Sequence, residues 1–215
     1  MKKLGLTICL VLLTTTMTWS QFSFHLIDNF EGGTLSSGTK WWRFGDLKIK
    51  IAENKETDSR DLISESCGVY SLNMSGQTND WYIGGIGADL QVSAERFSRF
   101  QIDVSGNNKY SGKLIVEFFD DDNYNYSIEQ DPQNNYEAVY DDKWVVELPV
   151  LGSGFSRYSV PFTAFRDANP GVGDDIWNPE QAGGSGGLLK MQLVAISGDK
   201  ASKVDFDIDN LILTY

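Results

Sequence analysis

The chain has 215 residues, a formal net charge of −12 and 13% aromatic residues. A protein this acidic repels phosphate backbones and anionic membrane surfaces, so nucleic acid is excluded as a partner. His25 is the only histidine, and it lies in an alternating segment. This argues against a histidine-dependent catalytic triad and against a histidine-rich zinc site.

The first segment, Met1–Ser20, is typical of a secretory signal peptide. Two lysines precede an apolar run, Leu4–Leu13, and small residues offer a cleavage site before Gln21. The run is too short to span a membrane. We therefore expect one domain over residues 21–215, secreted to the extracellular space or the periplasm, with no membrane insertion. Cys67 would be its single cysteine, which rules out an intramolecular disulfide.

The rest of the chain predicts strands separated by turns rich in Gly, Asn, Asp and Ser. Ten segments have this pattern: Phe22–Asn29, Leu47–Ala52, Val69–Met74, Trp81–Ile86, Phe97–Val104, Lys113–Phe119, Trp144–Leu148, Arg157–Pro161, Leu188–Ile196 and Lys203–Thr214. No segment keeps a helical period of 3.6 residues for three turns. The sequence therefore predicts an all-β protein built as a two-sheet sandwich or jelly roll.

The last segment, Lys203–Thr214, alternates apolar residues with aspartates and then becomes fully apolar. Such a strand is expected inside a sheet, beside an early segment that includes Asp28 and Glu31. That pairing would bring both near Asp209. Calcium takes six to eight oxygen ligands, often carboxylates, so Asp28, Glu31 and Asp209 are candidate ligands of a structural Ca²⁺ ion. The alternative is that they are solvated strand ends.

Two long polar loops are predicted, Asp120–Asp142 and Arg166–Gly187. Loops of this length in a compact domain are often functional. The first begins with Asp-Asp-Asp-Asn, but from Asp121 the EF-hand spacing puts Tyr126 at the glycine position and Pro132 at the glutamate position. The EF-hand match fails, and this start is interpreted as a solvated acidic loop.

Exposed tryptophan and tyrosine rings bind the flat C–H faces of sugars. Trp177 lies in a predicted loop, and Trp81 and Tyr82 are neighbours on a strand that should face opposite ways. Trp177 and one of this pair are candidate sugar-stacking residues. Trp42 and Trp144, each beside alternating residues, are interpreted as core residues.

Short motifs in order resemble the family 11 carbohydrate-binding modules and their relatives with galactose-binding-domain-like jelly rolls. The matching segments are LIDNFEG (Leu26–Gly32), Trp41 or Trp42, GVYSLNMSG (Gly68–Gly76), an aromatic-Gly strand (Trp81–Gly85), FSRFQIDV (Phe97–Val104), KLIVEFF (Lys113–Phe119), FSRYSVPFTAFR (Phe155–Arg166) and DFDIDNLIL (Asp205–Leu213). The resemblance covers nearly all of the expected mature chain.

This resemblance implies a non-catalytic jelly roll with structural calcium and a concave face that holds a β-glucan chain. It places Trp81 or Tyr82 on the family's aromatic strand and Trp177 at its loop tyrosine. It also implies that Asp141 or Asp142 and Arg166 bind sugar hydroxyls; of the two aspartates, Asp142 is the chosen candidate.

The leading hypothesis is a secreted, non-catalytic protein that binds a neutral, β-glucan-like polysaccharide through Trp81, Tyr82, Asp142, Arg166 and Trp177. The alternative is a structural or protein-interaction jelly roll with a partner at the cell surface or in a secreted assembly. A glycan-active enzyme ranks last, because 30 acidic residues make carboxylate pairs inevitable and none is distinguished by its context.

Overall fold

The computed structural model describes residues 24–35, 38–54, 68–107, 112–183, 185–198 and 202–215. The predicted signal peptide and Cys67 lie outside the described residues. Over the described part of the chain, no helix is both long enough and apolar enough to cross a membrane.

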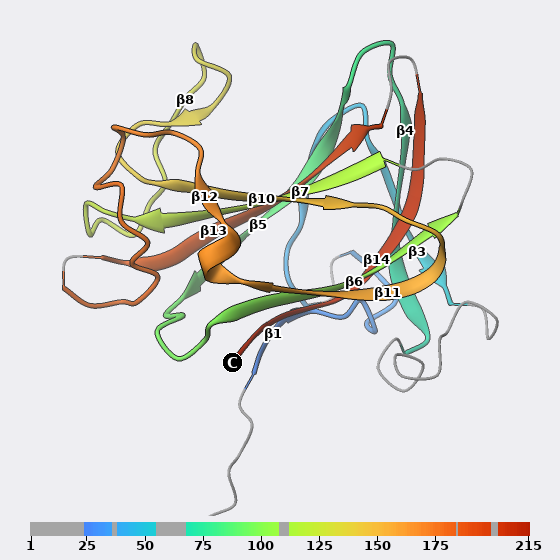
Figure 1. Ribbon diagram of the computed structural model, residues 1–215, viewed down its shortest axis with the longest axis horizontal. Helices are drawn as coiled ribbons and strands as arrows, with labels where there is room; N and C mark the ends of the chain where they lie inside the picture. The colour runs from blue at the N-terminus through green and yellow to red at the C-terminus, as the bar shows by residue number, and fades with distance from the viewer. Residues whose placement is uncertain (1–23, 36–37, 55–67, 108–111, 184, 199–201) are drawn as a thin grey trace, which may run out of the picture.

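Two antiparallel six-stranded sheets make up the fold (Figure 1). Sheet A has the order β11 (Ser153–Pro161), β6 (Arg99–Asn107), β14 (Lys203–Thr214), β4 (Tyr70–Gln77) and β3 (Lys48–Glu53), with β1 (His25–Asp28) also paired to β14. Sheet B has the order β12 (Arg166–Asp167), β10 (Lys143–Pro149), β7 (Gly112–Asp121), β13 (Gly187–Ser197), β5 (Tyr82–Val92) and β2 (Trp42–Gly45). A separate small hairpin pairs β8 (Gln130–Asp131) with β9 (Glu137–Ala138), and a 3₁₀ turn covers Phe162–Ala164.

The predicted two-sheet, all-β architecture is confirmed, and each of the ten predicted segments forms a strand. Four strands were not predicted: β2, β8, β9 and β12. They have two to four residues, which is too short for alternation to be recognised. The β8–β9 hairpin lies within the predicted first long loop.

The last strand, β14, lies inside sheet A, as the sequence predicts. It pairs with β6 on one side and with β4 and then β1 on the other. The register brings His25 opposite Leu213 and Leu26 opposite Ile212, so the first and last described strands pair in one sheet. The ladder with β6 shifts after Asp209, where Asn210 takes a φ of +48°, a conformation that asparagine tolerates better than most residues.

The hydrophobic core lies between the sheets. Val204, Phe206 and Ile208 of β14 are buried against a cluster that includes Phe118 and Leu193 of sheet B. Because side chains alternate along a strand, the intervening residues of β7 and β13 point away from this core. They form the outer face of sheet B.

Candidate functional site

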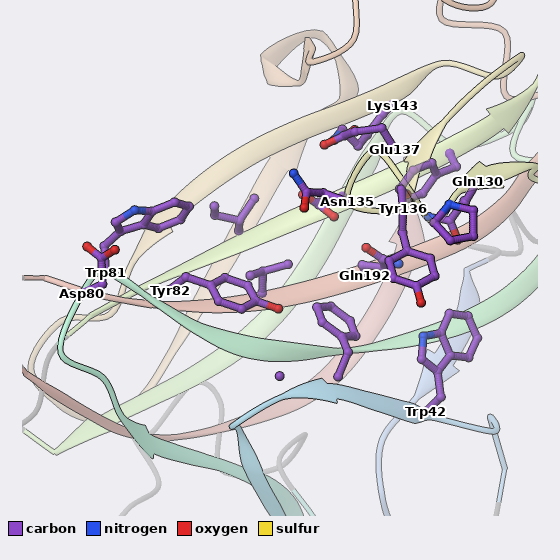
Figure 2. Close-up of a pocket in the computed structure, with 17 residues that line it drawn as sticks. Trp42, Asp80, Trp81, Tyr82, Gln130, Asn135, Tyr136, Glu137, Lys143 and Gln192 are labelled. Atoms are coloured by element: carbon purple, nitrogen blue, oxygen red, sulfur yellow. Dashed lines mark hydrogen bonds and ion pairs between the residues drawn. The ribbon is translucent and has the colours of Figure 1, made fainter.

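A groove of about 900 Å³ lies on the outer face of sheet B (Figure 2). Its floor consists of alternate residues of the two central strands: Ile115, Glu117 and Phe119 on β7, and Gln192 and Val194 on β13. Register places Gln192 beside Glu117. The floor therefore offers apolar surface with an amide and a carboxyl group in the middle.

Aromatic rings of the edge strand β2 extend this floor across β5. Trp42 is opposite Gly87 and Phe44 is opposite Gly85. A Cβ atom on Gly87 would lie 2.5 Å from the Trp42 indole, and one on Gly85 would lie 2.5 Å from the Phe44 ring. The two glycines therefore let both rings lie against the backbone of β5, and a larger residue at either position would displace them.

The β8–β9 hairpin forms a wall of the groove and contributes Gln130, Pro132, Asn135, Tyr136 and Glu137. Lys190 of β13 donates a hydrogen bond to Gln130 Oε1 at 2.7 Å, and Lys143 of β10 forms an ion pair with Glu137. Gln130 Nε2 also donates to the carbonyl of Tyr136 at 2.6 Å. These contacts fasten the hairpin to the sheet.

Asp80, Trp81 and Tyr82 line the other end of the groove, away from Trp42 and Tyr136 (Figure 2). Trp81 is 54% exposed and Tyr82 is 42% exposed, and their rings meet edge to face with centroids 6.0 Å apart. The expectation that the two face opposite ways is wrong. Trp81 precedes the first residue of β5, and the register with β13 shifts after Tyr82, so strict alternation does not apply.

Charges in the groove largely compensate one another. Burial raises the pKa of Glu117, while the Lys143 ammonium lowers it and Glu137 raises it. Burial also lowers the pKa of Lys190, whose Nζ lies 5.9 Å from the Trp42 ring centroid and 5.7 Å from that of Phe119. The groove thus combines open aromatic faces with hydrogen-bonding groups, which is the chemistry that binds a sugar ring.

The structure brings Trp81 and Tyr82 into the groove and places the other three predicted sugar-binding residues elsewhere. Trp177 packs against the core, with its ring centroid 5.0 Å from that of Phe162 and 5.6 Å from that of Trp144. Arg166 is exposed on the edge strand β12. Neither lines the groove.

Asp142, the third of these residues, is buried in a group of carboxylates with Asp120 and Asp122. Asp120, Asp121 and Asp142 have no exposed surface, so the interpretation of this segment as a solvated loop is wrong. Backbone N–H groups of residues 142, 176 and 178 bond to these carboxylates, so segments distant in sequence enclose the group. Burial raises the pKa of Asp120 to about 8, that of Asp142 to about 7 and that of Asp122 to about 6.

The predicted calcium ligands Asp28, Glu31 and Asp209 each bond to nearby N–H groups. Asp28 accepts from the backbone of Phe30 and from the Trp41 indole, both at 2.8 Å. Glu31 accepts from the backbone N–H groups of residues 69 and 70. Asp209 Oδ2 is buried and has no hydrogen-bond partner within the described residues. Calcium at these residues stays a prediction.

Sequence reasoning missed Trp42, Tyr136, Glu117 and Gln192 as groove residues, and the core interpretation of Trp42 is wrong. Trp144 does pack against the core, as expected. A signal for Trp42 was present: two aromatics spaced by one residue in Trp42-Arg43-Phe44 match two glycines with the same spacing in the segment Gly85–Gly87. The pairing of the two segments was needed to recognise it.

Comparison with solved structures finds the same fold in family 11 carbohydrate-binding modules. One from Clostridium thermocellum, solved in complex with a β-1,3-1,4-mixed-linked tetrasaccharide, has a TM-score of 0.54 and 14% identity, covering 91% of this chain and 97% of that one. The family 11 module of a cellulosomal cellulase of Clostridium thermocellum has a TM-score of 0.53 and 14% identity, covering 91% and 96%. A family 11 module solved in solution, CtCBM11, has a TM-score of 0.52 and 17% identity over the same shares.

No family model matches the chain, and no curated protein matches it. The likeness to the solved modules covers almost the whole length of both partners. It confirms the predicted carbohydrate-binding-module-like jelly roll.

Proposed function

We propose that the protein is a non-catalytic carbohydrate-binding protein that holds a neutral polysaccharide chain in the groove of sheet B. The observation that carries the proposal is the distribution of aromatic rings along the groove, of which Trp81, Tyr82 and Tyr136 are exposed. Trp81 and Tyr82 lie at one end, and Trp42 and Tyr136 lie toward the other (Figure 2). Rings at both ends suit an extended chain better than a single sugar.

Polar groups between these rings supply the orientation that stacking alone lacks. The amides of Gln192, Gln130 and Asn135 and the carboxyl group of Glu117 line the groove. Amides both donate and accept hydrogen bonds, as do sugar hydroxyls. A groove of about 900 Å³ lies within the range of pockets that bind small organic ligands.

The charge of the groove favours a neutral ligand over an acidic one. Lys143 is paired with Glu137 and Lys190 is bonded to Gln130, while Asp80 and Glu117 add negative charge. A uronic-acid polymer would bring further carboxylates to a protein whose net charge is already −12, and like charges repel.

Within the neutral polysaccharides, we infer an unbranched β-glucan as the first ligand to test. The support is the fold shared with the family 11 module that was solved with a mixed-linked tetrasaccharide. The proposal that the protein acts outside the cell rests on the predicted signal peptide, which lies beyond the described residues.

Affinity electrophoresis tests the proposal. The protein is run through native gels that contain mixed-linkage β-glucan, xylan, mannan or polygalacturonate, beside Trp42→Ala. We expect retardation by the β-glucan, less retardation of the variant, and none by polygalacturonate. A parallel assay for new reducing ends should stay negative. Free migration in every neutral gel would overturn the proposal and favour the alternative, a jelly roll that serves a protein partner.

A further inference from the structure

Three carboxylates converge behind the groove, where β7 ends and β10 begins. Asp120 is the last residue but one of β7, Asp122 directly follows that strand, and Asp142 immediately precedes β10. One oxygen from each lies within 4.8 Å of the others. Asp120 and Asp142 are fully buried, and burial of like charges this close together is unfavourable without compensation.

Hydrogen bonds fix the orientation of all three carboxylates. The Trp144 indole donates to Asp120 Oδ1 at 3.0 Å. The backbone N–H of Asp142 donates to Asp122 Oδ2 at 2.8 Å, and that of Ile176 donates to Asp142 Oδ2 at 3.1 Å. On both Asp122 and Asp142 these bonds occupy one oxygen, so the other remains available.

The remaining oxygens have no partner. Within the described part of the chain, Asp122 Oδ1, Asp142 Oδ1 and the amide oxygen of Asn178 are buried and accept no hydrogen bond. Asn178 belongs to the same group, since its backbone N–H donates to Asp120 Oδ2 at 3.1 Å. Buried oxygens are nearly always bonded, so the two unpartnered carboxylate oxygens, on aspartates whose oxygens approach within 4.8 Å of one another, point to a missing ligand that is positively charged.

Backbone geometry makes room for this arrangement. A Cβ atom on Gly173 would lie 2.2 Å from Asp122 Oδ2 and 2.4 Å from Asp142 Oδ1. Two carboxylates from different segments therefore reach the same point of the backbone, and a side chain there would force them apart.

Within the described residues, no lysine or arginine side chain forms an ion pair with these three aspartates. The three ion pairs found there use Glu147, Glu137 and Asp103 as acids. We propose that Asp120, Asp122 and Asp142, with the amide oxygen of Asn178, bind a hard divalent cation, and that this cation is calcium. An all-oxygen donor set from loops and strand ends suits calcium, which accepts six to eight ligands in flexible geometry.

The bound cation would join three segments: the end of β7, the start of β10 and residues 172–178. Phe119 and Lys143, the neighbours of Asp120 and Asp142, line the groove. The site is therefore structural support for the groove, and it is distinct from the calcium site predicted at the chain ends.

Terbium luminescence tests the assignment, because terbium occupies calcium sites and Trp144 is in direct contact with Asp120. The full protein, stripped with chelator, is titrated with terbium under tryptophan excitation, and calcium is then added in competition. We expect sensitised emission that calcium displaces. Asp142→Asn should weaken terbium binding at least tenfold, and so should Asp122→Asn.

Two matched variants serve as controls. Asp89→Asn changes an exposed aspartate of β5, and Asp209→Asn changes the predicted site at the chain ends; both should keep the emission of the cluster. The proposal is overturned if the wild type gives no calcium-displaceable emission, if Asp142→Asn and Asp122→Asn bind as the wild type does, or if Asp209→Asn alone abolishes the signal. Should Asp142→Asn fail to fold, Asp122→Asn and a chelator-induced fall in the wild-type melting temperature decide the matter.

Discussion

Replacing Trp81 by alanine separates binding from stability, because this ring is exposed at the rim of the groove. A tryptophan side chain offers about 200 Å² of surface, and the 54% exposure of Trp81 leaves about 100 Å² for a ligand to cover. At about 25 cal/mol per Å², full coverage contributes about 2.5 kcal/mol. Ordering of the ligand reduces this to about 2 kcal/mol, or roughly thirtyfold in affinity.

The assay is titration calorimetry with a soluble β-glucan oligosaccharide, accompanied by thermal denaturation. Trp81→Ala should bind roughly thirtyfold more weakly and melt within a few degrees of the wild type, because exposed substitutions cost little stability. Tyr215→Ala is the matched control, since Tyr215 is 55% exposed and does not line the groove. Unchanged affinity of Trp81→Ala would refute the stacking argument at this end of the groove.

Three further substitutions test other parts of the account. Trp177→Ala should cost about 3 kcal/mol of stability, as aromatic truncations in cores do, and lower the melting temperature by roughly 10 °C; a variant that melts normally but does not bind would place Trp177 in the site instead. Gly87→Ala should push the Trp42 indole off the floor and reduce retardation in β-glucan gels, and unchanged retardation would show that this ring does not hold the ligand. Burial, and after it the nearby acids, raise the pKa of Asp209 to about 8. With calcium removed by chelator, the protonated Asp209 carboxyl group therefore stabilises the folded state fully below about pH 4, and this stabilisation is lost as the pH rises toward 8. Asp209→Asn should therefore show a smaller loss of melting temperature between pH 5 and pH 8 than the wild type, and equal losses would contradict the assigned pKa.

The fold was predictable because most strands carry their own signal. Alternation in β14 and the apolar runs of β7 and β13 identify strands without any knowledge of their neighbours. The pairing of β1 with β14 followed from a single argument, that an apolar terminal strand needs cover on both sides.

The site was only partly predictable, because it depends on which face of sheet B the other sheet covers. Trp42 and Trp144 both lie beside alternating residues, and the sequence does not say that Trp144 faces the core while Trp42 lies over Gly87 in the groove. The burial of Asp120 and Asp142 likewise arises from contacts with residues 172–178, which are distant in sequence. Polar composition alone made that segment look solvated.

Affinity electrophoresis of the wild type and Trp42→Ala in mixed-linkage β-glucan gels tests the central claim most directly. The account predicts that the wild type is retarded, that the variant is retarded less, and that both are folded by circular dichroism. Equal retardation of the two proteins would show that the Trp42 end of the groove does not hold the sugar, and no retardation of the wild type in any neutral polysaccharide would contradict carbohydrate binding itself.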